Sequence, residues 1–239
     1  MLKNLLSENN RLKTDQLFEG LSAEELELLM GSGVTHTYRK GEIIFREGGI
    51  PMGIFYVQAG RVKKYKATVK GGEQILYLCG EGELMGYHAL LSEEHYPDSA
   101  ATTEESQITF IPKDNFLNVL RSSTALSNTL LKALAHEFSL FVNSITSSAT
   151  KSVRERLASN LLLLDEKFKS SDRGTPSEIN LSRTDLANMV GTAKETLVRL
   201  LHDFQRAGLI EKTNKTIRII DRRGVIKEAN LMGSNSKRN

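Results

Sequence analysis

The sequence contains very little cysteine: Cys79 is the single thiol among 239 residues. One thiol excludes an intrachain disulfide framework and any cluster that needs four thiolate ligands from one chain. Cys79 stands in the apolar stretch "ILYLCGEG". We therefore expect it to be buried as a small hydrophobic side chain.

Long hydrophobic runs are also missing. No apolar stretch approaches the roughly 18 residues that a membrane-spanning helix needs. The first residues, "MLKNLLSENNRLKT", contain no hydrophobic region long enough for a secretion signal. We expect a cytoplasmic protein with no membrane partner.

The motifs of the common enzyme classes are absent as well. The sequence has no P-loop, no G-x-S-x-G and no metal-ligand spacing among its five histidines. The adjacent acidic pairs Glu93-Glu94 and Glu104-Glu105 are typical of solvated loops. We predict that the protein is not an enzyme and that it holds no metal and no cofactor.

The net charge is only +3, but it is unevenly distributed. Residues 150–239 contain 18 Lys and Arg against 11 Asp and Glu, about +7, whereas the first 149 contain 14 against 18, about −4. A basic part behind an acidic part indicates a polyanionic partner for the C-terminal part. Chance surface charge is the alternative, and composition alone does not exclude it.

Between about residues 34 and 112 glycine separates a series of short β-type runs. A helix is predicted before them over residues 22–30, with Ser22 as N-cap and Glu25 closing a capping box. Many short strands with glycine at the joints predict a sandwich or a barrel-like roll. The runs are "GEIIF", "GIFYVQAG", "RVKKYKATV", "QILYLCGEG" and "SQITFIP", and "KGGEQ" (70–74) has the composition of a hairpin turn.

Helical periodicity begins at Lys113, and a long helix is predicted from about Ala125 to Ala149. Its apolar residues step by three and four, which is the narrow seam of a helix pair. Packing against the protein's own roll would explain part of this pattern, but a symmetric pair suits a seam with two phenylalanines better, so we expect a homodimer. The seam consists of Leu131, Leu134, Phe138, Phe141 and Ile145.

The stretch "SRTDLANMVGTAKETLVRLL" contains two helix-start signals. Ser182 precedes Asp185 by three residues, and Thr192 precedes Glu195 by three. We expect Ser182 and Thr192 to be the N-caps of two helices, the first of which ends at Gly191, where a left-handed residue costs least. Two helices joined by so short a glycine-containing turn form a helix-turn-helix.

The second of these helices has an apolar side for the core and a polar side for a partner. The polar side suits the major groove, because Arg199 can donate two hydrogen bonds to guanine and Glu195 can accept one from cytosine. The alternative is a surface ion pair between them, with Glu195 closing the capping box. Positive charge and the hairpin predicted around "TNKT", which suits a wing, favour base reading. The polar side consists of Lys194, Glu195, Val198, Arg199 and His202, and the apolar side of Leu197, Leu200, Leu201 and Phe204.

The order of these parts resembles the Crp/Fnr family of bacterial transcription regulators. The resemblance covers about residues 15–228 and is most specific in "LSRTDLANMVGTAKETLVRLLHDFQRAGLIE". It implies an α+β fold: an N-terminal cyclic-nucleotide-binding-like β-roll (a double-stranded β-helix), a long dimerisation helix and a C-terminal winged helix-turn-helix. The corresponding domains are 1–124, 125–149 and 150–230, and we expect residues 231–239 to be a disordered tail.

The resemblance also implies a homodimer on two-fold symmetric double-stranded DNA that recruits RNA polymerase. It makes Glu195 and Arg199 of the E-T-x-x-R element the base-reading residues, with Lys194 at a neighbouring DNA contact. We expect the two recognition helices to lie in successive major grooves about 34 Å apart. Contacts with phosphates would supply much of the affinity and its salt dependence. Further candidates for DNA contact are Arg183, Thr192, Val198, His202, Lys212, Lys215 and Arg218.

The cyclic-AMP-binding branch of the family carries a phosphate cassette from which this sequence departs. In the matching stretch "GELMGYHALLSEEHYPDSA", Tyr87 stands in place of a ribose-binding glutamate and Asp98 in place of a phosphate-binding arginine. On the long helix, Phe141 and Val142 stand where that branch offers hydroxyl groups to the adenine. Because an aspartate repels a phosphate, we expect that cyclic AMP is not bound.

An effector of another kind is left open. The four positions just named are the candidates to line its pocket, although Tyr87 and Tyr96 could instead fill the space and leave a regulator that needs no ligand. Haem would need an axial ligand such as His88 or Cys79, and a lone histidine in a loop is more typically solvated. The alternative function is a ligand-sensing interaction module whose helix-turn-helix serves protein contacts.

Overall fold

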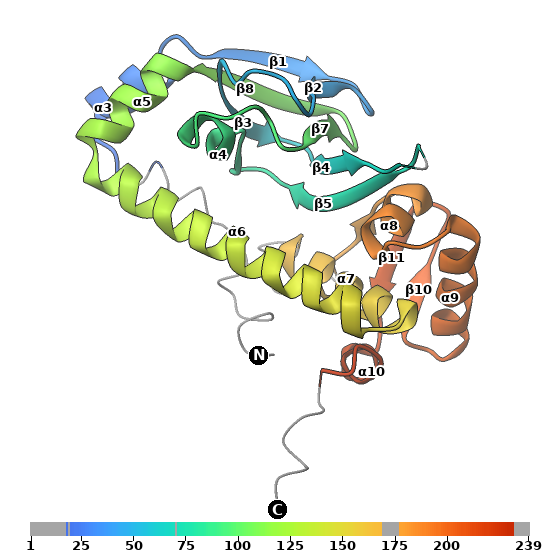
Figure 1. Cartoon of the computed structure of the whole chain (residues 1–239). Coiled ribbons are helices and arrows are strands. Elements are labelled where there is room, and N and C mark those ends of the chain that lie inside the picture. The colour runs from blue at the N-terminus through green and yellow to red at the C-terminus, as the bar shows by residue number, and fades with distance from the viewer. Residues whose placement is uncertain (1–17, 19, 70, 169–176, 232–239) are drawn as a thin grey trace, which may run out of the picture. The chain divides into compact units, whose positions relative to one another are not determined.

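The computed structural model describes residues 18, 20–69, 71–168 and 177–231. Contacts divide the chain into two compact units, one ending at Phe141 and the other beginning at Val142 (Figure 1). Lys70 of the predicted hairpin turn, residues 169–176 and most of the predicted tail (232–239) lie outside the described residues.

The strands of the N-terminal unit form two four-stranded antiparallel sheets (Figure 1). The order is β1-β8-β3-β6 in one sheet and β2-β7-β4-β5 in the other. The chain therefore passes back and forth between the two sheets, which is the path of a roll, and the predicted fold class is confirmed. The strands are β1 (Val34–Tyr38), β2 (Ile43–Phe45), β3 (Gly53–Ala59), β4 (Val62–Ala67), β5 (Glu73–Cys79), β6 (Leu84–Met85), β7 (Ser99–Thr102) and β8 (Ser106–Pro112).

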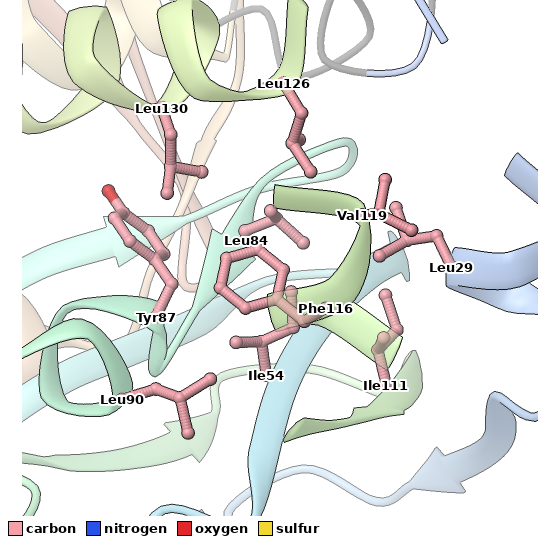
Figure 2. Close-up of a cluster of buried hydrophobic side chains, with 10 residues drawn as sticks. All are labelled: Leu29, Ile54, Leu84, Tyr87, Leu90, Ile111, Phe116, Val119, Leu126 and Leu130. Carbon is pink, nitrogen blue, oxygen red and sulfur yellow. The ribbon is translucent and has the colours of Figure 1, made fainter. Parts of the chain in front are cut away.

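A hydrophobic core joins the first sheet to the helices of this unit (Figure 2). Ile54 of β3, Ile111 of β8 and Phe116 are completely buried, and Leu126 and Leu130 pack against the same cluster. Each such side chain contributes about 1.5–3 kcal/mol relative to an exposed position. The helices are α3 (Ala23–Met30), α4 (Tyr87–Leu91), α5 (Lys113–Ser122) and the first turns of α6 (Thr124–Thr150).

A second core lies between the two sheets. The rings of Phe45 and Tyr96 stack with their centroids 4.2 Å apart, and Cys79 is buried beside them in the same cluster, as predicted. Gly86 precedes α4 at φ 82°, and a Cβ atom added there would lie 3.2 Å from the Tyr96 ring. Glycine is therefore required at the point where the chain leaves β6 for α4.

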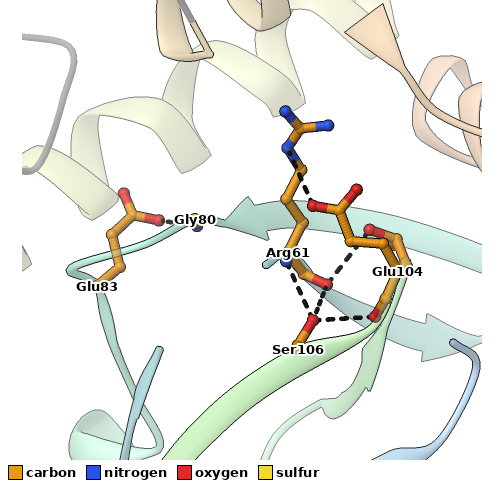
Figure 3. A network of polar contacts seen from close by, with 6 residues as sticks. Arg61, Gly80, Glu83, Glu104 and Ser106 are labelled. Carbon is orange, nitrogen blue, oxygen red and sulfur yellow. Dashed lines mark hydrogen bonds and ion pairs between the residues drawn. The ribbon is translucent and has the colours of Figure 1, made fainter. Parts of the chain in front are cut away.

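Polar contacts hold the turns at one end of the roll (Figure 3). The backbone amide of Arg61 donates to Ser106 Oγ at 3.2 Å, and the Arg61 side chain pairs with Glu104 at 3.7 Å. A carboxylate oxygen of Glu83 accepts a hydrogen bond from the backbone amide of Gly80 at 2.7 Å. Glu104 lies in the bend between β7 and β8, partly exposed as the sequence indicated, and its carboxylate there pairs with Arg61.

The C-terminal unit combines helices with a three-stranded antiparallel sheet of order β10-β11-β9. Ser152 caps α7 by accepting from the amide of Glu155, whose carboxylate accepts from the Ser152 amide at 2.7 Å. The predicted hairpin around "TNKT" is confirmed as β10 and β11, whereas α10 was not predicted. The elements are α7 (Val153–Lys167), β9 (Ile179–Asn180), α8 (Arg183–Val190), α9 (Lys194–Arg206), β10 (Ile210–Lys212), β11 (Thr216–Ile219) and α10 (Arg222–Glu228).

Candidate nucleic-acid interface and sensor interior

Helices α8 and α9 form the predicted helix-turn-helix. Ser182 is the N-cap of α8, and its hydroxyl accepts from the backbone amide of Asp185 at 3.0 Å. Gly191 ends α8 in the left-handed conformation, at φ 71° and ψ 52°. Both predicted boundaries of the first helix are therefore confirmed.

The predicted N-cap of the second helix is wrong. Ala193, not Thr192, is the N-cap of α9, and no side chain accepts a capping hydrogen bond there. After the left-handed residue the amide of Thr192 still donates back to Ala187, at 3.1 Å, so the turn takes one residue more than the pattern indicates. Glu195 consequently lies at the second helical position rather than the third, where it cannot close a capping box.

The two faces of α9 are divided as predicted. Leu197, Leu201 and Phe204 are buried in the unit. Glu195 and Arg199 are exposed, and within the described part of the chain neither forms an ion pair or a side-chain hydrogen bond. Their charged groups are therefore open to solvent. Of the other candidates on this helix and its turn, Lys194 and His202 are exposed and Thr192 and Val198 are half-buried.

The wing hairpin contacts both helices of the motif. Lys212 Nζ lies 3.3 Å from His202 Nε2 of α9. Arg183 Nη2 donates to the carbonyl oxygen of Thr213 at 2.8 Å, while its Nη1 is buried without a hydrogen-bond partner in the described structure. Burial lowers the pKa of Arg183, which nonetheless stays a cation. Much of this guanidinium is turned into the protein and is thereby less available to a phosphate than the sequence indicated.

The other two basic candidates of the wing differ from each other. Arg218 Nε donates to a carboxylate oxygen of Glu178 at 3.0 Å, so its charge is already paired. Lys215 is exposed at the tip of the hairpin, where its backbone amide donates to Thr213 Oγ1 at 3.2 Å. Lys215 is thus the freer cation of the two.

In the β-roll, Tyr87 and Asp98 are both buried. Tyr87 begins α4 and donates a hydrogen bond to Glu137 of α6 at 2.7 Å. Asp98 forms an ion pair with Lys64 of β4 at 3.2 Å, and its other carboxylate oxygen is buried with no hydrogen-bond partner in the described part of the chain. Burial raises the pKa of Asp98, and the Lys64 ammonium opposes that shift.

His88 is placed differently from the prediction. It lies in helix α4 rather than in a loop, is half-buried, and has a buried Nδ1 atom with no partner among the described residues. Burial lowers its pKa to about 4, and the charge of Lys64 acts in the same direction. Phe141 and Val142, the other two pocket candidates, are exposed on α6, by 56% and 45%, and are not enclosed in a pocket.

Two protein-family models match this chain. Residues 35–123 match the cyclic nucleotide-binding domain, and residues 155–227 match the Crp-like helix-turn-helix domain. The matches cover the roll and the winged helix-turn-helix, in the order that the resemblance implied. The chain belongs to the Crp/Fnr family of transcription regulators.

Similar Crp/Fnr proteins align along most of this chain. The cyclic AMP receptor protein of Thermus thermophilus is 26% identical over 208 residues, covering 87% of this chain and 94% of that protein. The fumarate and nitrate reduction regulatory protein of Vibrio cholerae is 29% identical over 186 residues, covering 77% and 73%. The solved structure of FixK2 from Bradyrhizobium japonicum has a TM-score of 0.72 at 19% identity, covering 85% and 99%, and this likeness shows the fold alone.

Within this Crp/Fnr chain, the sequence prediction missed Lys64, the partner of the cassette residue Asp98. The side chains of a strand point alternately to its two faces, so Lys64, two residues after the buried Val62 in β4, lies on the same inward face. The described residues hold no cluster of three His, Cys, Asp or Glu side chains suited to a metal ion. No helix in the described ranges is both long and apolar enough to cross a membrane.

Proposed function

We propose that this chain is a homodimeric regulator that reads a two-fold symmetric DNA site with one α9 helix from each protomer, and that cyclic AMP is not its effector. The observation that carries the proposal is that Glu195 and Arg199 are exposed and have no partner among the described residues, on a helix whose opposite face is buried. Charged side chains left without partners on a recognition helix are available to base edges.

Base reading assigns different roles to the two residues. Arg199 donates two parallel hydrogen bonds to the O6 and N7 atoms of a guanine, and Glu195 accepts one from the N4 amino group of a cytosine. Lys194, one residue before Glu195 at the N-terminus of the same helix, contacts the DNA beside them. Each half-site therefore contains at least one G·C pair.

Contacts with phosphates supply the part of the affinity that does not depend on sequence. Lys215 at the wing tip and Lys212 beside His202 carry exposed or half-buried charge for this purpose. To bind a phosphate, Arg183 would have to give up its hydrogen bond to the Thr213 carbonyl. Arg218 would have to give up its ion pair with Glu178. We therefore expect Lys215 to contribute more than either arginine.

The dimer forms along α6. Four side chains of the predicted seam are more than half exposed in the single chain. Phe138 is 68% exposed and Ile145 55%, and Leu131 and Phe141 lie between these values. Four large apolar side chains at spacings of seven, three and four residues make one continuous stripe on a helix. A second copy of α6 covers this stripe and sets the separation of the two recognition helices.

Two features of the roll interior support a regulator that does not use cyclic AMP. The carboxylate of Asp98 stands where the resemblance places a phosphate-binding arginine, and Lys64 already neutralises it. Tyr87 occupies the position of a ribose-binding glutamate and is bound to Glu137. Recruitment of RNA polymerase and a cytoplasmic location remain predictions from the family resemblance and the sequence.

A competition assay separates this function from the alternative of a protein-interaction module. The wild-type dimer and the double variant Glu195→Ala/Arg199→Ala are bound to a labelled palindromic duplex and challenged with a scrambled duplex of the same composition. DNA reading predicts strong preference in the wild type and none in the variant. Arg206→Ala, on the same helix but bound to Asp203, is the matched control and keeps the preference. If all three proteins show the same ratio of binding to the palindromic and scrambled duplexes, Glu195 and Arg199 do not read bases, and the interaction module is favoured.

A further inference from the structure

Arg156 of α7 joins the ends of two helices in the C-terminal unit. Its Nε donates to the carbonyl oxygen of Val190 at 2.9 Å, and its Nη2 to that of Gly191 at 3.2 Å. Its Nη1 donates to the carbonyl oxygen of Lys151 at 2.9 Å. Val190 is the last residue of α8, and Lys151 directly follows α6. One guanidinium therefore binds the C-terminal carbonyls of the first helix of the motif and of the dimerisation helix.

The physical chemistry of helix ends favours this arrangement. The last carbonyls of a helix have no partner within the helix and carry the negative end of its dipole. A cation placed there is stabilised, and two helix ends converge on Arg156. A planar guanidinium holds several acceptors in fixed directions, whereas a lysine ammonium acts as a point charge on a flexible stem.

The start of α9 depends on support of this kind. Ala193 provides no capping side chain, and Gly191 is the left-handed residue of the turn, with more conformational freedom than any other residue type. Local interactions alone therefore leave the direction of α9 weakly defined. The bonds from Arg156 fix the carbonyls of Val190 and Gly191 from outside the turn.

We propose that Arg156 is a positioning residue that sets how the recognition helix leaves the turn, and that it ties this turn to the end of the dimerisation helix. The inference rests on the proposed function, because the direction of α9 decides whether Glu195 and Arg199 reach base edges. Arg156 acts through backbone carbonyls and not through a base. Its effect is therefore on selectivity between DNA sequences, more than on affinity for DNA in general.

The test compares selectivity in Arg156→Lys and in a control. Arg156→Lys keeps the charge but cannot hold three carbonyls in the geometry of a planar fork. We expect the ratio of Kd values for a scrambled and a selected palindromic duplex, measured at one salt concentration, to fall about tenfold or more. We expect Kd for the scrambled duplex to change less than about twofold, because the charge is retained.

Arg154→Gln is the matched control on the same helix. Arg154 binds Glu228 at 2.6 Å and lies over the ring of Phe204 in α9, but within the described part of the chain it has no hydrogen bond to the turn. Its loss removes a cation and an ion pair, and we expect the selectivity ratio to stay near the wild-type value. An unchanged ratio in Arg156→Lys, or an equal fall in Arg154→Gln, would overturn the positioning role.

A second readout needs no DNA. Amide hydrogen exchange in the free protein is measured over residues 191–196 and over α7, in the wild type and in Arg156→Lys. The inference predicts faster exchange at the turn with unchanged exchange in α7, and equal exchange at the turn contradicts it. If the wild type itself selects no duplex, the proposed function fails, and this exchange measurement still decides whether Arg156 holds the turn.

Discussion

The hydroxyl group of Tyr87 lies 2.7 Å from a carboxylate oxygen of Glu137 and donates a hydrogen bond to it. Tyr87 begins α4 of the roll, and Glu137 lies in the middle of α6, so the bond joins the roll to the helix that carries the exposed seam. Figure 2 shows the Tyr87 side chain directed toward α6. Burial, reinforced by the Glu137 carboxylate, raises the pKa of Tyr87 far above its usual range, so the hydroxyl is always a donor.

Tyr87→Phe removes this bond and nothing else of comparable size. Because Glu137 is half-buried and can recover part of its hydration, we expect the free energy of unfolding to fall by about 1–2 kcal/mol in chemical denaturation. The matched control is Tyr96→Phe, since the buried Tyr96 donates only a long bond, 3.4 Å, to the carbonyl of Gly53. A loss in Tyr87→Phe no greater than in Tyr96→Phe would show that the contact with α6 does not stabilise the roll.

Lys64→Met removes the cation that is paired with the buried Asp98 carboxylate, and we expect a loss of about 3 kcal/mol in the free energy of unfolding at pH 8. The folded-state pKa of Asp98 is raised by burial, so its contribution to stability is present at low pH and is lost as pH rises through that pKa. In Lys64→Met the opposing charge is gone and the shift is larger. The loss relative to the wild type should therefore shrink from pH 8 to pH 5.

Lys63→Met is the control for this pair. Lys63 is the neighbouring residue on β4, and its ammonium pairs at 2.5 Å with Glu73, whose side chain is 33% exposed against 7% for Asp98. Because the Glu73 carboxylate can recover its hydration when the lysine is removed, we expect a clearly smaller loss than in Lys64→Met, with little dependence on pH. Equal losses in Lys63→Met and Lys64→Met, or a loss in Lys64→Met that grows at pH 5, would contradict the buried ion pair.

His88 gives the roll a second dependence on pH. Burial lowers its folded-state pKa from 6.5 to about 4, so neutral His88 contributes stability above pH 6.5 that is lost as pH falls toward 4. We expect His88→Gln to flatten the fall in unfolding free energy between pH 7 and pH 5. His95→Gln, at an exposed position seven residues further along the chain, serves as the control and should follow the wild-type curve. Identical slopes in all three proteins would refute the assignment to His88.

Phe138→Glu places a charge in the seam of α6, where Phe138 is 68% exposed in the single chain. We expect the variant to sediment as a monomer at a protein concentration at which the wild type is a dimer, because a buried carboxylate without a partner is costly at an interface. Ser139→Glu, one residue further along the helix and off the seam, should remain dimeric. A dimeric Phe138→Glu protein would mean that the seam is not the interface.

The sequence predicted the helices and turns whose ends are determined by residues close to them in the chain. Ser182 and Gly191 define α8 through a side-chain cap and a left-handed residue, and both act over a few residues. The exposed and buried faces of α9 follow from helical periodicity alone. The failed prediction at Thr192 has the same origin: a spacing that looks like a capping box does not reveal how many residues the turn consumes.

Contacts between distant segments could not be predicted in this way. Lys64 meets Asp98 because β4 pairs with β7, with Tyr65 opposite Ser99, and that register is a property of the whole roll. The reach of Arg156 to Val190 likewise depends on how α7 packs against α8. In both cases the sequence contains the residue but not the information that selects its partner.

Base reading by α9 is tested most directly by selecting duplexes from a random library with the purified protein, without added ligand, at about physiological salt. Base reading predicts an enriched palindrome with a G·C pair in each half-site. In a parallel selection with Arg199→Ala, it predicts relaxed choice at one G·C pair and a loss of roughly 1–3 kcal/mol in binding free energy. An enriched site that is the same for both proteins, or equal weakening on all sequences, would contradict base reading by α9.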